Sequence, residues 1–503
     1  MASSEFVNVD AIILPAQQLP QNPNNIALFT TESAIVGVQD FTVHTSLKSV
    51  GDAYGTTSET YSIIANGIFS QQPNILTGNG SLTIIPFNGV NATQTTVTTE
   101  DLTPRILAFK SVSNGKIKAT IDGVTILDVN GADFTKITTV NDIATVIQKI
   151  LPESKIKLAV INGALQFKSL KYGVSSAVLL EAGTLSGTDL LDSTLLDGLN
   201  LSTVAGVNAS GETLVAASTR ILALPEAQRP IFEGVLTNLK FELHYATGTY
   251  LQLTASYFNS LEKIFINTYS STNDTPNMLL VKDAGLNNFK SIYQKDDELL
   301  QMRAGVTGLL FSNNTSFPNL SQTLNKKQIT GVTPALYLLD GDKIALRNAG
   351  VDFYIKNLGV PAYVSNAMSE GYIDDTYNKK IITLECLTAY DNALTVLTKI
   401  PQTQAGINFI AGQMDIVLQK LRTNGIVAQT NNQIQWNSNT APTNLPFQVF
   451  QDIIKSEGYY IEIPNIAKQS QGDREARKCP PIPIYVQLAG AIHTISSIIY
   501  IQR

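Results

Sequence analysis

The spacing of apolar residues predicts two strands in the last thirty residues of this chain. Ile482, Ile484, Val486 and Leu488 occupy every second position, which is the period of a strand with one buried face. Gly490 breaks this pattern, and a second alternating run follows it, made of Ile495, Ile499 and Ile501.

The second C-terminal run has little sequence after it to cover its edge. Only Gln502 and Arg503 follow Ile501. An uncovered apolar strand favours pairing with another chain. We therefore expect this strand to pair with a second copy of the same protein.

A similar strand-prone run lies near the N-terminus. Phe6, Val7 and Val9 are its apolar residues, and a Gln-, Pro- and Asn-rich stretch separates it from the rest of the chain. An extended segment on such a linker is suited to reach a neighbouring subunit. We predict that Phe6, Val7, Val9, Ile495, Ile499 and Ile501 form inter-subunit strand arms.

The remaining patterns alternate between helix and strand signals. A helix is expected from Ser58, with an apolar face through Ile68, and a strand over 82–86 follows the Asn79-Gly80 turn. Two hairpins are expected at Asp122-Gly123 and Asn162-Gly163, with a helix over 140–150 between them. Further on, the predicted elements are a strand at 264–266, a helix at 296–302, a strand at 306–311, a helix at 342–348 and strands at 352–355 and 362–364.

These elements predict a mixed α/β (α+β) multidomain fold. A long helix containing Phe409, Met414, Val417 and Leu421 should end at Gly425, which suits a C-terminal cap. The expected division is an arm and linker at 1–25, a core segment at 26–103, an inserted β-rich domain at 104–218, a middle α/β domain at 219–370 and a C-terminal core domain at 371–503.

Composition narrows the possible functions. The 503 residues are 44% hydrophobic and 15% charged, with a net charge of −6, and no basic run with interleaved aromatics is present. Direct nucleic-acid binding therefore has no support. No apolar stretch reaches the length of a membrane span, so membrane insertion is not expected. Two cysteines do not make a disulfide framework.

The sequence offers little catalytic chemistry. His44, His244 and His493 lie far apart in sequence, Cys386 sits in an apolar run, and Cys479 has no spaced partner for zinc. The acidic pairs Asp296-Asp297 and Asp374-Asp375 do not require a catalytic dyad, because acidic residues are also favoured at the start of a helix. No phosphate-binding glycine loop is present. We expect no catalytic, cofactor-binding or metal-binding residues, and no enzyme.

The segment Asp473–Ile484, continuing to His493, resembles the C-terminal signature of contractile phage tail sheath proteins. Within it we mark Arg474, Arg477, Pro481, Gly490 and His493 as core signature residues. Shorter stretches resemble the same family in the same order along the chain. They are 46–50, 58–61, 69–73, 349–354, 371–374, 400–406 and 424–426.

The resemblance implies a structural subunit of a contractile tail. Such sheaths are helical homo-oligomers of stacked rings around a tail tube, and contraction drives the tube through the host envelope during genome delivery. The N- and C-terminal parts of the chain would form a tube-facing α/β core, with inserted α/β and β-rich domains outside. The implied partners are other copies, the tail tube protein, and baseplate and tail terminator proteins, in a virion assembled in the host cytoplasm.

Two other interpretations stay open at this stage. One is another phage tail or baseplate structural protein, which would form a smooth assembly that does not contract. The other is a glycan-binding adhesin, with the 104–218 insert as the binding module, which would favour a monomer with saturable ligand binding. Arg474 and Arg477 either pair with acids on a neighbour or are solvated.

Overall fold

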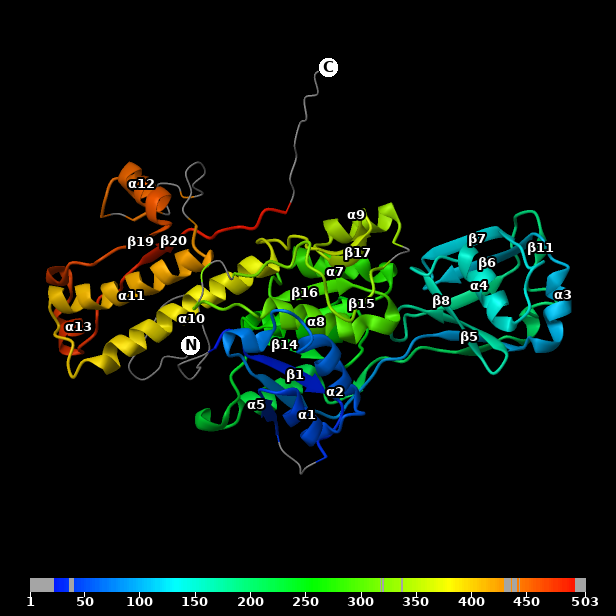
Figure 1. Cartoon of the computed structure of the whole chain (residues 1–503), viewed down its shortest axis with the longest axis horizontal. Helices are drawn as coiled ribbons and strands as arrows, with labels where there is room; N and C mark the ends of the chain where they lie inside the picture. Colours follow the sequence, from blue (N-terminus) through cyan, green and yellow to red (C-terminus); the bar gives the residue numbers. More distant parts are fainter. Residues whose placement is uncertain are drawn as a thin grey trace, which may run out of the picture.

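The computed structural model describes residues 22–35, 40–316, 318, 321–335, 338–428, 436, 441–442 and 444–493. The molecule is elongated, with a central sheet domain, a β-rich insert at one end and a largely helical C-terminal lobe at the other (Figure 1). None of the helices in this described part combines the length and apolar character needed to cross a membrane.

An eight-stranded sheet forms the centre of the molecule. Its spatial order is β18-β17-β16-β15-β14-β1-β3-β2. The six inner strands are parallel, and the edge strands β2 and β18 are antiparallel to their neighbours. The bounds are β1 (Ile26–Thr30), β2 (Thr42–His44), β3 (Leu82–Pro86), β14 (Gly234–Thr237), β15 (Ile264–Tyr269), β16 (Phe289–Tyr293), β17 (Asp352–Asn357) and β18 (Val360–Val364).

Helices cover both faces of this sheet, so its inner strands are buried on both sides. Ile264 and Ile266 point into one apolar cluster, whereas Phe265 points into the other. The first face is covered by α1 (Leu47–Tyr54), α2 (Glu59–Ile63), the π-helical turn η1 (Ile64–Ile68) and α8 (Leu299–Leu310). The second is covered by α5 (Leu214–Leu222), α6 (Tyr250–Ser260), α7 (Thr275–Asp283) and α9 (Asp340–Asn348).

The mixed α/β class predicted from sequence is confirmed by this arrangement. The sheet also joins two stretches that the sequence analysis treated separately. Strand β1 pairs with β14 on one side and with β3 on the other, so strands from 26–103 and from 219–370 share one hydrogen-bonded layer.

The predicted strand at Val306–Phe311 is wrong. The helix expected at 296–302 instead begins as a short 3-10 turn and continues as α8 to Leu310. Every residue of α8 except Gln301 is buried, because the helix lies between η1 and the sheet. A short apolar run that is buried on all sides shows no helical periodicity, so the pattern did not distinguish it from a buried strand.

The insert contains two four-stranded sheets and a separate apolar core. The predicted hairpins are confirmed by the pairs β6–β7 and β8–β9, and the helix over 140–150 is α4. The strands are β5 (Thr96–Asp101), β6 (Gly115–Ile121), β7 (Thr125–Ala132), β8 (Ile156–Ile161), β9 (Ala164–Ser169), β10 (Val178–Glu181), β11 (Thr188–Asp189) and β12 (Ser202–Val204), with helices α3 (Ile106–Lys110) and α4 (Val140–Ile150).

The C-terminal lobe is carried by a long helical hairpin. Helix α10 (Ile373–Val396) starts within the central core, where Tyr377 is buried and its hydroxyl donates to Asn24 Oδ1 at 2.5 Å. Helix α11 (Gln404–Asn424) returns and ends at Gly425, whose left-handed conformation confirms the predicted cap. The lobe is completed by α12 (Phe447–Glu457), β19 (Tyr459–Ile461), α13 (Gln471–Glu475) and β20 (Ile484–Val486).

Candidate assembly interface

A two-stranded antiparallel sheet, β19–β20, lies on the helical hairpin of the C-terminal lobe. Its register runs from Tyr459 opposite Val486 to Ile461 opposite Ile484. Backbone bonds of 2.8 Å close the ladder at both ends, from Glu462 N to Pro483 O and from Gln487 N to Gly458 O. Among the described residues this sheet has only two strands, and strand edges of this kind accept a further strand through backbone hydrogen bonds.

Beyond β20 the chain continues as an extended segment toward the central domain. The Ala428 amide donates to Gln487 O at 2.9 Å, and the Ala489 amide donates to Ile426 O at 2.8 Å. Ile484, Val486 and Leu488 pack against the apolar cluster that includes α11. The first predicted C-terminal strand is therefore confirmed over 484–486, with its alternating face turned inward.

The opposite side of this small sheet carries aromatic side chains. Phe450 of α12 lies with its ring centroid 5.5 Å from that of Tyr485 and 6.0 Å from that of Tyr460. The Tyr485 hydroxyl donates to Glu462 Oε2 at 3.2 Å. Burial and this carboxylate raise the pKa of Tyr485. The aromatic layer fixes α12 over the strands.

The core signature residues lie at the two ends of the extended C-terminal segment and do not form one cluster. Arg474 is exposed on α13, and its guanidinium donates to Ile466 O at 3.2 Å. Arg477 is also exposed and has a positive φ of 55°. Pro481 and Gly490 are exposed as well. In the single subunit both arginine side chains are exposed to solvent. Their pairing with acidic residues of a neighbouring subunit stays a prediction.

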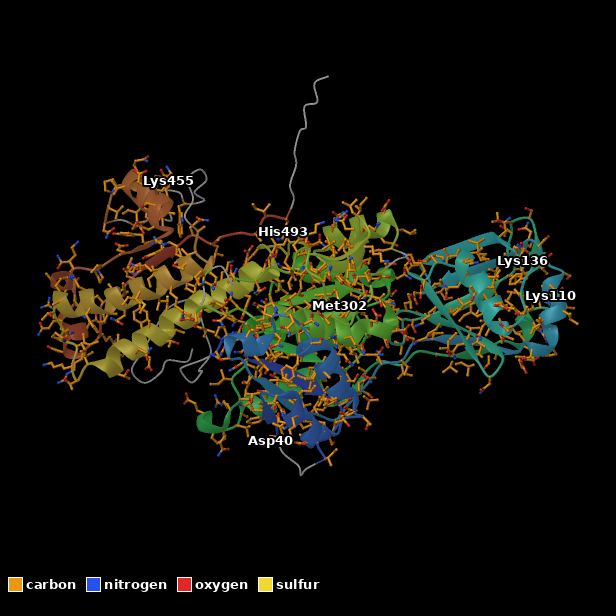
Figure 2. The ribbon with its side chains drawn as sticks, in the orientation of Figure 1. Asp40, Lys110, Lys136, Met302, Lys455 and His493 are labelled. Atoms are coloured by element: carbon orange, nitrogen blue, oxygen red, sulfur yellow. The ribbon has the colours of Figure 1, made fainter. Side chains whose placement is uncertain are left out.

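His493 lies where the extended segment reaches the central domain (Figure 2). Its ring packs edge-on against Tyr372, with centroids 4.3 Å apart. Its carbonyl accepts from Asn325 Nδ2 at 3.3 Å, whereas its buried Nδ1 has no hydrogen-bond partner within the described structure. His493 thus attaches the end of the segment to the start of α10.

The six predicted arm residues lie outside the described part of the chain. Phe6, Val7 and Val9 precede residue 22, and Ile495, Ile499 and Ile501 follow residue 493. Their role as inter-subunit strands stays a prediction.

The residues considered for catalysis are separated in the structure. His44 is buried, its Nδ1 lies 3.0 Å from Ser49 Oγ, and burial lowers its pKa. His244 is exposed in the loop after β14. Cys386 is buried on α10, and burial raises the pKa of its thiol to about 12. Across the described residues, no group of three or more His, Cys, Asp or Glu side chains is arranged to hold a metal ion.

Sequence reasoning missed a set of charged pairs between the insert and the central domain. Four insert lysines each pair with a central-domain aspartate, including Asp296 and Asp297, which the sequence analysis assigned to a helix start. A weak signal was present, since Lys155 and Lys157 are spaced to lie on one face of a strand. Their aspartate partners are more than a hundred residues away and had no local signal.

Residues 373–501 match the family model described as E217 tail sheath protein gp31-like, C-terminal domain. This match confirms the resemblance to tail sheath proteins over residues 373–501.

Two solved structures match most or all of the length of the chain. The crystal structure of the sheath tail protein Lin1278 from Listeria innocua is 11% identical, with a TM-score of 0.41, over 81% of this chain and 86% of that one. The cryo-EM structure of the anti-feeding prophage baseplate is 9% identical, with a TM-score of 0.43, over 100% of both chains. At these TM-scores the similarities carry no functional argument. A comparison with curated protein sequences gives no match.

Proposed function

We propose that this protein is the structural subunit of a contractile phage tail sheath. The observation that carries the proposal is the C-terminal lobe, which matches a tail sheath family model over residues 373–501 and contains a sheet that has two strands among the described residues. The subunits polymerise as stacked helical rings around a tail tube. The partners are other copies of the chain, the tube protein, and the baseplate and terminator proteins at the ends of the tail, within a virion assembled in the host cytoplasm.

Strand exchange supplies the connection between subunits. The N-terminal arm (Phe6, Val7, Val9) and the C-terminal arm (Ile495, Ile499, Ile501) add strands to the β19–β20 sheets of neighbours. Backbone hydrogen bonds in a shared sheet depend little on side-chain identity, and linkers on either side absorb rotation of whole subunits. The rings therefore stay connected while the sheath changes length.

Contraction draws on the difference between two sets of subunit contacts. A gain of a few kcal/mol per subunit is sufficient, and one interface of roughly 1,600 Å² can supply it. The chain acts through assembly and contact rearrangement, and no nucleotide or cofactor takes part. Contraction drives the tube through the host envelope during genome delivery.

Negative-stain electron microscopy of the purified chain tests this function. We expect hollow cylinders from the full-length protein and none from a variant with Ile495→Lys, Ile499→Lys and Ile501→Lys. The matched control replaces the same three isoleucines with valine, which retains strand propensity and should still give cylinders. Circular dichroism checks that all three proteins are folded.

Monodisperse folded monomers of the full-length protein at high concentration would reject the sheath function. Smooth fibres that keep one length and diameter under all conditions would instead favour another tail or baseplate component. Saturable glycan binding by a monomer would favour an adhesin.

A further inference from the structure

The insert and the central domain have separate apolar cores. The cluster of buried apolar residues in the insert draws only on residues 97–196, and the two clusters of the central domain include none of them. Domains without a large shared apolar interface are expected to move relative to each other. The contact between these two bodies therefore depends on polar groups.

Two antiparallel chain segments connect the insert to the central domain. Strand β4 (Gly89–Val90) pairs with β13 (Ser210–Gly211), and the Thr93 amide donates to Val207 O at 2.8 Å. We call residues 89–93 and 207–211 the stalk. The stalk is attached to the central domain, since the Ala92 amide donates to Lys240 O at 2.8 Å, and its two paired chains form one connection to the insert, whose core is separate.

Four ion pairs hold the insert against the central domain, and in all four the positive charge lies on the same side. The lysines come from the insert and the aspartates from the central domain. Lys155 pairs with Asp342 at 3.3 Å, Lys168 with Asp296 at 3.1 Å and Lys171 with Asp274 at 3.6 Å, and Lys157 pairs with Asp297. We call these eight residues the lysine–aspartate seam.

The groups around the seam are also polar. The Tyr172 hydroxyl donates to Asp296 Oδ1 at 2.9 Å. Asn273 Nδ2 donates to Asp122 Oδ2 at 2.9 Å, and the Thr125 hydroxyl donates to Asn273 Oδ1 at 2.9 Å. Leu170 is a buried apolar residue at this boundary, and its carbonyl accepts from Ser270 Oγ at 3.2 Å. Water can replace each of these hydrogen bonds when the surfaces separate, so opening the seam exposes these charged and polar groups to solvent.

We propose that the lysine–aspartate seam is a releasable lock that sets the orientation of the insert, and that the insert swings about the stalk when the seam opens. The complementary charge of the two faces fixes the docked orientation. The same chemistry makes docking sensitive to ionic strength, because screening weakens interactions between charges. This inference concerns a single chain and does not depend on the proposed function.

Lysine acylation followed by mass spectrometry tests the lock on full-length monomer isolated by size exclusion. Lys118 is the internal control, since it pairs with Glu181 inside the insert at 3.0 Å and its side chain is 27% exposed, close to the 30% of Lys168. On raising NaCl from about 0.1 to 1 M, we expect the acylation rates of Lys155, Lys168 and Lys171 to rise by roughly tenfold more than that of Lys118.

A variant separates seam opening from a general effect of salt. Asp274→Asn, Asp296→Asn and Asp342→Asn together should increase labelling of the seam lysines at low salt and enlarge the radius of gyration in solution scattering. Glu181→Gln should do neither. Circular dichroism confirms that the variants are folded.

The proposal is overturned if the seam lysines of the wild-type protein gain no more reactivity than Lys118 at high salt. That comparison stands even where the triple variant fails to fold, because it uses the unaltered chain. An unchanged radius of gyration in a folded triple variant would also overturn it.

Discussion

At the scale of single residues, the central sheet contains charged side chains that are fully buried. Lys290 and Asp352 are both 0% exposed, and their charged atoms lie 2.6 Å apart. Lys290 Nζ also donates to Gly350 O and Asn366 O, at 2.8 and 2.7 Å. Burial lowers the pKa of Lys290 and raises that of Asp352, and the partner charge opposes both shifts. The pair joins β16 to β17 inside the buried central sheet.

Lys290→Met is expected to lower the free energy of unfolding by about 3–5 kcal/mol, because it leaves a buried carboxylate without its cation. Chemical denaturation measures the loss. The matched control is Lys343→Met, which removes an exposed ion pair with Asp340 and should change stability by less than about 1 kcal/mol. Equal effects of the two substitutions would contradict this account.

Asp274 is expected to make stability depend on pH. It is 2% exposed, and burial raises its pKa to about 7, with Lys171 opposing and Asp122 reinforcing the shift. The folded state therefore binds a proton that the unfolded state releases between about pH 4 and 7, so this residue reduces stability as the pH rises through that window.

Asp274→Asn removes this titration while keeping a neutral side chain of the same shape. The melting temperature of the variant relative to wild type should increase from pH 4.5 to pH 7.5, corresponding to at most about 4 kcal/mol. Thermal unfolding at several pH values measures it. A difference that does not change with pH would contradict the raised pKa.

At the scale of elements, the crossing of η1 and α8 depends on small residues. A Cβ placed on Gly67 would lie 2.3 Å from Ala304 Cβ, and one on Gly308 would lie 2.7 Å from Ile68 O. Glycine at these two positions lets the backbones approach more closely than side chains allow. Met302, which is buried in the first half of α8, is labelled in Figure 2.

Gly67→Ala should destabilise the protein by about 1–3 kcal/mol, because the added methyl group forces α8 away from η1. Gly412→Ala is the control, since a Cβ at that position of α11 meets nothing within 4 Å. It should be neutral or stabilising by up to about 1 kcal/mol, as expected for alanine in a helix interior. Thermal denaturation compares the two, and a Gly67→Ala protein as stable as wild type would contradict the close crossing.

The sequence predicted most of the elements that are marked by a local pattern, such as a turn dipeptide or a capping residue. The Asp122-Gly123 and Asn162-Gly163 turns fix the insert hairpins, because both residues of each turn have positive φ. Ser58 accepts from the Tyr61 amide and starts α2 as its sequence predicts. The failure at Val306–Phe311 occurred where an element is buried on every side, and only the packing of α8 decides its conformation.

At the scale of the whole molecule, three bodies lie in a row, and the C-terminal lobe shares an apolar cluster with the central domain whereas the insert has its own. Helix α10 runs from the centre into the C-terminal lobe, and Lys380 on this helix pairs with Glu233 at 2.7 Å. Burial alone raises the pKa of Glu233, but Lys263 and Lys380 hold it below its ordinary value. This charged group fixes the helix that positions the candidate assembly interface.

Replacing residues 95–205 with a short Gly-Ser linker should leave a folded protein, because the insert shares no apolar core with the rest. The stalk brings the two ends close enough to be joined. We expect a cooperative unfolding transition and cylinders in electron microscopy like those of the full chain. Loss of the fold would show that the seam contributes more than orientation.

The sequence by itself determined the α/β class, the hairpins, the caps and the resemblance of residues 473–493 to tail sheath proteins. Each of these depends on residues that are close together in the chain, such as Asn424-Gly425 at the end of α11. Only the tertiary structure decided that β1–β3 share a sheet with β14–β18, that α8 is a helix and that Lys155, Lys157, Lys168 and Lys171 face a row of aspartates. These features arise from contacts between distant segments, which depend on packing and charge complementarity and leave no local pattern.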